Sequence, residues 1–435
     1  MSTFFIKGGK KLKGEIPVSA GKNAPVALLC AALLIKGQIT LKNMTRGQEV
    51  QRVLEILESI GVQIGWNSET ELILEVPDTL NIKNIDRHAC EVTRISILLF
   101  GALAAREKKF KIYKAGGCKL GNRTVRPHTL ALEKLGVHVD SHDDYYEVQT
   151  KKLKGAKVVM YEAGDTPTEN IIIAAALAEG ETVIKFASAN YMVQQVCYFL
   201  EAAGAKIEGI GNTTLKIIGV KSLKTNVEYA VSPDPVDAMA WIALGITTKS
   251  PLNIIGCPID FLELELEKLS VMGQKFQLKN DRFAENGKTP LVDIEIIPSD
   301  LVALPDKLAP QPFPGINIDN VPLFIPILTQ AEGRTLVHDW IYENRAIYYL
   351  EFQKLGANVL LLDPHRVMIE GSTKLKANEV ICPPAIRPGM ALLIAMIAAE
   401  GESILRNTYP IERAYDGLLE RLHGVGADIR RGEES

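Results

Sequence analysis

Leu57-Glu-Ser-Ile-Gly61-Val-Gln-Ile is the stretch that decides the fold, because the chain repeats its pattern along its whole length. The pattern is a helix-like segment ending in Leu-x-x-x-Gly, followed by an alternating apolar stretch. Glycine at this place closes a helix in the left-handed αL conformation, and the alternation after it is typical of a strand. We therefore interpret the stretch as a helix end joined through one glycine to a β-strand.

Five further copies of the pattern follow the first. They are Leu132-Glu-Lys-Leu-Gly136, Leu200-Glu-Ala-Ala-Gly204, Phe352-Gln-Lys-Leu-Gly356, Leu419-Glu-Arg-Leu-His-Gly-Val-Gly426 and a degraded copy that ends at Gly273. Successive glycines lie 75, 68, 69, 83 and 70 residues apart, which disfavours a coincidence of common helix-ending sequences. One such unit cannot bury its own faces, so the repeats must pack together, and six copies suggest two groups of three.

A second helix is expected in each unit, because a small residue followed by Glu-Gly recurs before another strand. The examples are Ala176-Leu-Ala-Glu-Gly180, Gln330-Ala-Glu-Gly333 and Ala398-Ala-Glu-Gly401. Each unit thus contains two helices and several strands, which predicts an α/β fold.

The bulk composition excludes several classes of protein. The 435 residues, 47% of them apolar, suffice for two large domains. With a net charge of −3, the chain has no excess of positive charge that would attract nucleic acid or an anionic membrane. The chain has no apolar run of membrane-spanning length and no signal-peptide pattern, and its six scattered cysteines lack metal-ligand spacing. We expect a cytoplasmic protein that acts on small molecules, without nucleic-acid, membrane, metal or cofactor partners.

The loop Gly116-Gly-Cys118-Lys-Leu-Gly-Asn-Arg123 has the composition of a reactive site. Its glycines allow positive φ and close approach to a ligand. Lys119 and Arg123 favour the reactive thiolate and could hold a phosphate or carboxylate. A lone cysteine is more often a buried structural residue. Its neighbours here favour covalent or acid–base work on an anionic substrate.

Two other segments could serve the same chemistry. Lys22 and Asn23 precede an apolar helix, and a cation, an amide and a helix N-terminus together form an anion site. The segment is not a P-loop, because the spacing differs, and alone Lys22 would be a surface residue. Asp319 follows a Pro/Gly-rich loop and precedes an apolar helix, so it is either an N-cap or a carboxylate base at a cleft edge.

Further candidates are weaker when each is taken alone. Four arginines beside helix starts or in loops are more often ordinary ion-pair residues; they are Arg94, Arg345, Arg387 and Arg413. His128 is either an acid–base group or a loop histidine with satisfied hydrogen bonds.

Together these motifs resemble the UDP-N-acetylglucosamine enolpyruvyl transferase family over essentially the whole chain. The matching segments surround Lys22, Cys118, Asp319, Arg345 and the C-terminal Arg413-x-Tyr. Several independent motifs in the right order make the resemblance specific. The related 5-enolpyruvylshikimate-3-phosphate synthase is a poorer match, because it lacks the Gly-Gly-Cys loop.

The resemblance implies a two-domain inside-out α/β barrel built from six repeats of a small βαβαββ-like unit. One domain would comprise residues 1–21 and 233–435, and the other residues 22–232, with the Cys118 loop on the second. The site would lie in the cleft between the domains, which closes on substrate. The family also implies a monomer that needs no cofactor or metal.

The family reaction transfers the enolpyruvyl group of phosphoenolpyruvate to a hydroxyl of UDP-N-acetylglucosamine and releases phosphate, for peptidoglycan synthesis. The matching positions imply that four cations, which suit a ligand with phosphate and carboxylate, hold phosphoenolpyruvate: Lys22, Arg94, Arg123 and Arg413. Cys118 would protonate C3 and be alkylated by fosfomycin, and Asp319 would take the acceptor's hydroxyl proton. Together with these two, Lys22 and Arg413 complete the catalytic set. Arg345 and Arg387 would support the cleft.

The resemblance also implies a set of acceptor contacts, drawn from both domains. They are Asn23, Arg123, Thr124, Val125, His128, Gly164, Asp165, Thr166, Asp319 and Ile341.

The chain departs from the family pattern in this acceptor half. Glu162 stands beside Asp165 where a lysine is usual, and Gln48 also replaces a lysine. Two carboxylates there would repel a diphosphate, at a cost on the order of several kcal/mol if desolvated. Arg126, where the family usually has aspartate, is the candidate compensating cation. Two alternatives therefore stay open: a paralogue that uses a different nucleotide or sugar acceptor, and a ligand-binding homologue without turnover. The presence of Cys118 and Asp319 argues against the second.

Overall fold

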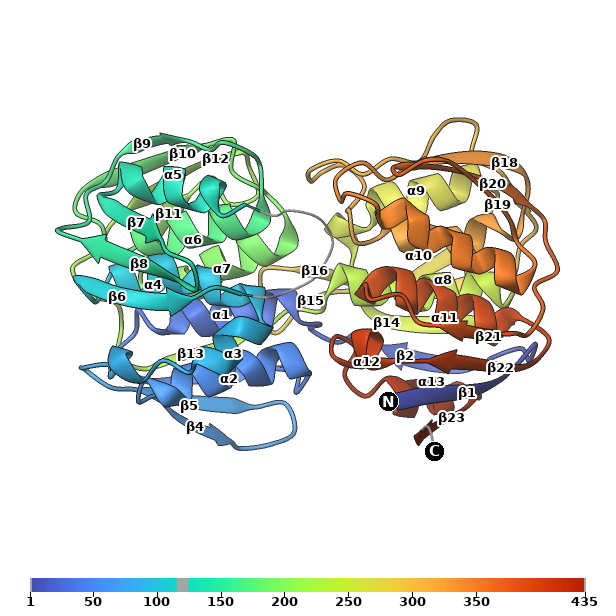
Figure 1. Ribbon diagram of the computed structural model, residues 1–435, viewed down its shortest axis with the longest axis horizontal. Coiled ribbons are helices and arrows are strands. Elements are labelled where there is room, and N and C mark those ends of the chain that lie inside the picture. The colour runs from blue at the N-terminus through green and yellow to red at the C-terminus, as the bar shows by residue number, and fades with distance from the viewer. Residues whose placement is uncertain (1, 116–123, 434–435) are drawn as a thin grey trace. The chain divides into compact units, whose positions relative to one another are not determined.

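The computed structural model describes residues 2–115 and 124–433 (Figure 1). The contacts within the chain divide it into two compact units. Of the described residues, unit 1 contains those up to Gly21 and from Pro233 onward, and unit 2 contains those between Lys22 and Ser232. The N-terminal segment and the C-terminal half thus share one unit.

Unit 1 begins with two strands and continues beyond residue 232 with alternating helices and strands. Its strands are β1 (Ser2–Gly8), β2 (Gly14–Pro17), β14 (Leu252–Pro258), β15 (Lys275–Phe283), β16 (Pro290–Ile297), β17 (Leu301–Val302), β18 (Ala331–His338), β19 (Asn358–Asp363), β20 (Arg366–Gly371), β21 (Glu379–Ile381), β22 (Gly401–Arg406) and β23 (Asp428–Glu433). Its helices are α8 (Pro235–Thr247), η3 (Ile259–Phe261), α9 (Glu263–Val271), α10 (Val321–Leu328), η4 (Arg345–Leu355), α11 (Ile386–Ala398), α12 (Tyr409–Glu412) and α13 (Leu418–Gly424), where η marks a 3-10 helix.

The strands of unit 1 form three four-stranded sheets of the same design. Their orders are β21-β22-β1-β23, β15-β16-β14-β2 and β17-β18-β20-β19. In each sheet one edge strand pairs in parallel, β21 with β22, β2 with β14 and β17 with β18, and the other pairings are antiparallel. Since β1 lies between β22 and β23, the first strand completes the last sheet.

The core of unit 1 is built from helices α8, α10 and α11, which pack on one another. Every residue of α8 and of α10 is buried. A helix that is apolar all round is typical of a core position. The antiparallel sheets lie outside and keep one face toward solvent, as strand β22 does with its alternating exposure.

Unit 2 is likewise built from alternating helices and strands. Its helices are α1 (Asn23–Ala32), α2 (Gln48–Ser59), η1 (Ile82–Asn84), α3 (Arg87–Val92), η2 (Arg94–Leu98), α4 (Leu99–Ala104), α5 (Arg126–Lys134), α6 (Asp165–Ala175) and α7 (Tyr191–Ala202). Its strands are β3 (Gly37–Lys42), β4 (Gln63–Trp66), β5 (Leu72–Val76), β6 (Lys109–Tyr113), β7 (Val137–Ser141), β8 (Tyr145–Thr150), β9 (Lys157–Val159), β10 (Glu181–Lys185), β11 (Lys206–Glu208), β12 (Thr214–Ile218) and β13 (Val227–Ala230).

The described strands of unit 2 also form three sheets. Two have four strands, in the orders β13-β3-β5-β4 and β11-β12-β10-β9, with a parallel pair at one edge. The third is the antiparallel sheet β6-β8-β7. Helices α1, α4, α6 and α7 pack together beneath these sheets, and α4 is buried along its whole length. Both units therefore place helices inside and sheets outside.

The six glycines that decided the fold take the predicted conformation. Their φ angles lie between 84° and 101°, at Gly61, Gly136, Gly204, Gly273, Gly356 and Gly426. Each follows a helix and precedes a strand, in chain order β4, β7, β11, β15, β19 and β23. The helix before Gly356 is a 3-10 helix. The αL helix endings are thus confirmed at all six positions.

The helices and the cysteines of the structure can be compared with what the composition predicted. No helix in the described ranges combines the length and apolarity needed to cross a bilayer. Five cysteines are buried free thiols: Cys30, Cys90, Cys197, Cys257 and Cys382. Burial raises the pKa of Cys90 and of Cys382 to about 12, which makes these thiols poor nucleophiles.

Candidate active site

Asp319 lies in the segment that leads into helix α10, and Arg387 is its charged partner. The Arg387 Nε donates to Asp319 Oδ2 over 3.3 Å. Only 6% of the Arg387 side chain is exposed, against 23% for Asp319, so a buried cation faces a partly accessible carboxylate. The Tyr415 ring lies 5.2 Å from the guanidinium carbon. Asn320, not Asp319, is the N-cap of α10, so the N-cap interpretation of Asp319 is wrong.

Arg345 is held by buried charged and polar side chains and is linked to this segment. Its Nε and a terminal nitrogen donate to the two oxygens of Asp339 over 2.6 and 2.7 Å. The same terminal nitrogen donates to the carbonyl oxygen of Ile318, the residue before Asp319, over 2.7 Å. Tyr349 donates to Asp339 as well, and burial, followed by the Asp339 charge, raises the Tyr349 pKa well above its ordinary value. Arg345 therefore fixes the backbone next to Asp319.

The other candidates in unit 1 lie on separate elements. Arg413 is the C-cap of α12, and its N–H donates to the Tyr409 carbonyl over 3.1 Å. Ile341 lies between β18 and η4 and is 37% exposed.

In unit 2, the predicted phosphoenolpyruvate ligands lie at the starts of two helices. Lys22 is the N-cap of α1, and its Nζ donates to Asn23 Oδ1 over 2.9 Å. Arg94 begins η2, and a terminal nitrogen donates to the Thr124 carbonyl over 3.3 Å. The structure thus joins Arg94 to an acceptor candidate thirty residues further along. Arg123, the other predicted phosphoenolpyruvate ligand of this unit, and Cys118, the predicted acid, lie outside the described residues.

His128 belongs to a cluster of neutral hydrogen bonds that also contains Thr166 and Asn170, here called the His128 cluster. The Asn170 Oδ1 accepts from the Gly101 N–H over 2.6 Å, so its Nδ2 is the donor to His128 Nδ1 over 3.0 Å. The remaining proton is assigned to Nε2, which lies 3.4 Å from Thr166 Oγ1. Burial, followed by the Arg94 charge, lowers the His128 pKa to about 3. The imidazole is therefore neutral and bonded at physiological pH, as a structural histidine would be.

The acidic residues of the acceptor half occupy different surroundings. Asp165, the first residue of α6, accepts from Ser188 Oγ over 2.5 Å and from Asn190 Nδ2 over 3.2 Å. Glu162 and Arg126 are both exposed, and no ion pair in the described part of the chain joins them. Neutral donors and a helix N-terminus thus stabilise Asp165.

Sequence reasoning missed several buried acids near these candidates. Glu169 on α6 is 2% exposed, and burial, followed by the Asp165 charge, raises its pKa well above the ordinary value, while the Lys22 charge opposes the shift. Asp339 and Glu265 are likewise buried in unit 1. Nothing in the sequence distinguishes such residues from the surface carboxylates around them. In the described ranges, no group of three His, Cys, Asp or Glu side chains could hold a metal ion.

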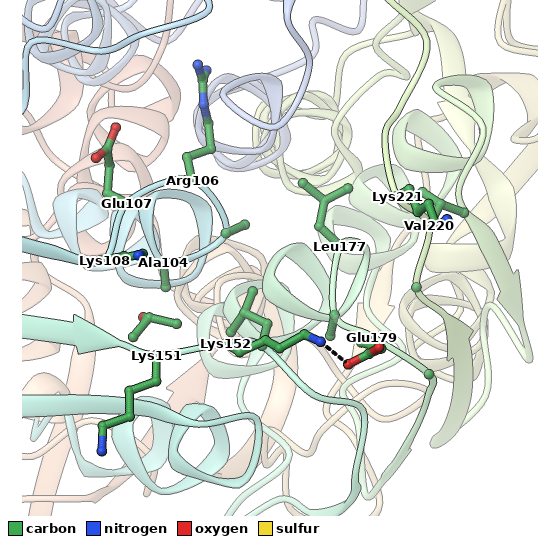
Figure 2. A pocket seen from close by; sticks show the side chains of 16 residues that line it. Ala104, Arg106, Glu107, Lys108, Lys151, Lys152, Leu177, Glu179, Val220 and Lys221 are labelled. Carbon is green, nitrogen blue, oxygen red and sulfur yellow. Dashed lines mark ion pairs between the residues drawn. The ribbon is translucent and has the colours of Figure 1, made fainter.

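A hollow of about 490 Å³ lies within unit 2, at the ends of α4, β8, α6 and β12. Figure 2 shows the side chains that line it. Its lining includes Arg106 and Lys152 but none of the predicted site residues. Lys152 forms an ion pair with Glu179 over 2.5 Å, and the guanidinium of Arg106 donates to carbonyls of Leu33 and Pro77. These two cations are therefore engaged by the protein itself.

The chain belongs to the EPSP synthase (3-phosphoshikimate 1-carboxyvinyltransferase) family, whose sequence profile matches residues 6–422. Within it, the chain is 33% identical to the UDP-N-acetylglucosamine 1-carboxyvinyltransferase of Bradyrhizobium diazoefficiens, over 99% of this chain and 98% of the relative. It is 34% identical to the enzymes of that name from Borreliella burgdorferi, over 99% of each chain, and Treponema denticola, over 100% of each. The family resemblance found in the sequence is confirmed.

Solved structures establish the fold. The enolpyruvyl transferase NikO from Streptomyces tendae has a TM-score of 0.86 at 22% identity, covering 99% of both chains. An EPSP synthase from Acinetobacter baumannii has a TM-score of 0.75 at 18% identity, covering 100% of both. The mixed α/β fold is thus that of enolpyruvyl transferases.

Proposed function

We propose that this protein transfers the enolpyruvyl group of phosphoenolpyruvate to a hydroxyl of UDP-N-acetylglucosamine and releases phosphate, as a step in peptidoglycan precursor synthesis. The observation that carries the proposal is the 33–34% identity, over 99% or more of this chain, to relatives that bear the name of this activity. The site residues supply a physical account of how the reaction would run.

Phosphoenolpyruvate carries a phosphate and a carboxylate, so its binding needs several cations. We assign this role to Lys22, Arg94, Arg123 and Arg413. Lys22 and Arg94 stand at helix starts, where backbone N–H groups add to the attraction for an anion. Arginine also offers paired donors that match the oxygens of both anionic groups.

The chemistry requires an acid for C3 of phosphoenolpyruvate and a base for the acceptor hydroxyl. In the proposed addition, Cys118 gives a proton to C3, the acceptor oxygen bonds to C2, and Asp319 takes the hydroxyl proton. In the elimination, the Cys118 thiolate left by the addition takes a proton from C3, the bond from C2 to the phosphate oxygen breaks, and the double bond returns. The proton held by Asp319 leaves with the phosphate. The products are the enolpyruvyl ether and phosphate.

Asp319 suits the role of base because it is both accessible and charge-stabilised. Arg387, at 3.3 Å, favours its ionised form, and its partial exposure leaves room for a substrate hydroxyl. Arg345 holds the preceding carbonyl and thereby restricts the loop. We assign Arg345 and Arg387 supporting roles in this sense.

We further propose that the acceptor is contacted by the residues expected from the resemblance, with the His128 cluster shaping that half of the site from within. A different nucleotide or sugar acceptor is the second candidate, and the acidic pair Glu162 and Asp165 favours it. Glu162 is exposed, and Asp165 accepts hydrogen bonds from Ser188 and Asn190, so both carboxylates bring negative charge to this half of the site. A diphosphate would therefore meet negative charge unless Arg126 compensates for it.

The experiment is phosphate release from phosphoenolpyruvate, with the product identified by mass, across a panel of UDP-sugars, UMP, UDP and no acceptor. The proposal expects release that depends on UDP-N-acetylglucosamine and a matching enolpyruvyl product. Release with another acceptor only would favour the second candidate. The absence of release with any acceptor would favour a ligand-binding homologue.

The role of Cys118 has a separate test. We expect fosfomycin to form a covalent adduct with the native protein, detected as an increase in intact mass, and no adduct with Cys118→Ala. An adduct that persists in Cys118→Ala would refute the assignment.

The same proposal includes the finer architecture. We propose that the two units are domains of residues 1–21 with 233–435 and of residues 22–232. Each would hold three repeats of one βαβαββ-like unit, arranged as an inside-out barrel. The matching φ angles at six repeat glycines and the shared sheet design support this arrangement. A cytoplasmic location and a monomeric state are part of the proposal, and size-exclusion chromatography with light scattering tests the second.

A further inference from the structure

Glu265 is a buried carboxyl that the reaction account above does not use. It lies on helix α9 with 2% of its surface exposed, between the buried leucines Leu262 and Leu269. A carboxyl at such a core position costs free energy unless its oxygens find hydrogen-bond donors. The partners of Glu265 therefore indicate what it holds in place.

The Glu265 carboxyl accepts two hydrogen bonds from residues that flank Asp319. One oxygen, Oε1, accepts from the backbone N–H of Asn317 over 3.2 Å and from the side-chain amide of Asn320 over 2.8 Å. Asn320 is fully buried and stands at the N-cap position of helix α10. A single carboxyl oxygen thus ties the residues two before and one after Asp319 to helix α9.

A second link continues this chain to Asp319 itself. The Asn317 Oδ1 accepts from the Asp319 N–H over 2.9 Å, and the Asn317 carbonyl accepts from the Asn320 N–H over 2.9 Å. These bonds fold residues 317–320 into a tight turn, in which the asparagine side chain stabilises the backbone two residues on. The orientation of the Asp319 carboxylate therefore depends on the placement of Asn317.

We propose that Glu265 is a positioning residue for the base Asp319, acting through Asn317 and Asn320. The inference rests on the proposed function, since Asp319 is the base only if the chain is an enolpyruvyl transferase. Glu265 touches no substrate in this account. It complements Arg345 of η4, which holds the Ile318 carbonyl, so the segment around Asp319 is anchored at residues 317, 318 and 320.

The required property of Glu265 is its acceptor oxygen and not its charge. Burial raises the Glu265 pKa, while the bonds from Asn320 and Asn317 oppose the shift. Glutamine keeps an acceptor oxygen in the same place, so Glu265→Gln should preserve the turn. Glu265→Leu removes the acceptor and leaves the buried Asn320 amide and the partly buried Asn317 N–H without it.

The test is steady-state kinetics of Glu265→Leu, Glu265→Gln and the control Glu267→Leu, an exposed position on the same helix. A misplacement of about 1 Å can cost roughly 100-fold in rate. We expect Glu265→Leu to lower kcat by about 10- to 100-fold with little change in either KM. Glu265→Gln and the control should stay close to wild type. In an Asp319→Asn background, Glu265→Leu should have no further effect, since the base is already absent.

Hydrogen exchange of the peptide covering residues 316–321 separates this inference from the proposed function, because it needs no substrate. Exchange should be faster in Glu265→Leu and unchanged in Glu265→Gln. If Glu265→Leu fails to fold, Asn317→Ala breaks the second link and should show the same kcat loss and faster exchange at Asp319. Unchanged exchange in the broken variants, or an equal rate loss in the Asp319→Asn background, would overturn the inference.

Discussion

The Asp319 segment of unit 1 and the His128 cluster of unit 2 hold candidate residues by different means. Around Asp319 the anchors include buried charges, with Arg345 paired to Asp339 and Arg387 to Asp319 itself. Around His128 the bonds join neutral groups, an imidazole, an amide and a hydroxyl. Buried charges fix geometry strictly, because a broken pair leaves an uncompensated charge. Rearranging hydrogen bonds between neutral groups costs less free energy. The contrast suggests that unit 1 places the reacting base and unit 2 shapes the acceptor contact.

The largest loss of stability should come from breaking the buried pair in unit 1. Arg345→Leu leaves Asp339 without its bidentate partner, and both side chains are at most 1% exposed. We expect the free energy of unfolding to fall by about 3–5 kcal/mol, measured by denaturant titration. Arg334→Leu, which breaks an exposed pair with Glu370, is the matched control and should change little. An equal, small effect in both variants would contradict the contrast.

A smaller effect is expected when a substrate cation is removed. Arg413→Ala should weaken phosphoenolpyruvate binding by about 1.5–3 kcal/mol, roughly 10- to 150-fold in Kd, because a charge-assisted contact is lost. Calorimetric titration measures it, with the exposed Arg431→Ala as control. Unchanged affinity in Arg413→Ala would remove this residue from the site.

The His128 cluster should make the stability of the protein depend on pH in the acid range. The His128 pKa is about 3 in the folded protein and about 6.5 when unfolded, so between these values only the unfolded state binds the proton. Stability is lost as pH falls through this window, with a slope of about 1.4 kcal/mol per pH unit from this group. His128→Asn should flatten the slope between pH 6 and 4, and exposed His138→Asn should not. An unaltered slope in His128→Asn would show that the imidazole is charged when folded.

The smallest effect concerns the exposed cation of the acceptor half. Arg126 forms no ion pair among the described residues, so any attraction for a diphosphate acts through solvent. Arg126→Ala should raise the KM for UDP-N-acetylglucosamine by less than about fivefold, and the difference should vanish at high salt. A larger, salt-resistant rise would indicate direct contact with the acceptor.

Local structure was predictable from sequence where one residue type decides the backbone. The six repeat glycines took αL conformations because only glycine adopts them without strain. The apolar helices around Ala27 and Leu392 were equally clear.

The anchors of the Asp319 segment were not predictable, because they depend on long-range contacts. Glu265 lies 52 residues from Asn317 in sequence, and Arg387 lies 68 residues from Asp319. In the sequence, Glu265 is one of three glutamates in the stretch that forms helix α9. Its role follows only from the fold, which turns it inward to meet two asparagines.

The most direct test of the account is acceptor-dependent phosphate release by wild type and by Asp319→Asn, measured side by side with phosphoenolpyruvate and UDP-N-acetylglucosamine. We predict turnover by wild type and a kcat about 10²- to 10⁴-fold lower in Asp319→Asn, with both KM values nearly unchanged. Wild-type turnover that survives the substitution, or a loss confined to KM, would contradict the assignment of the base to unit 1.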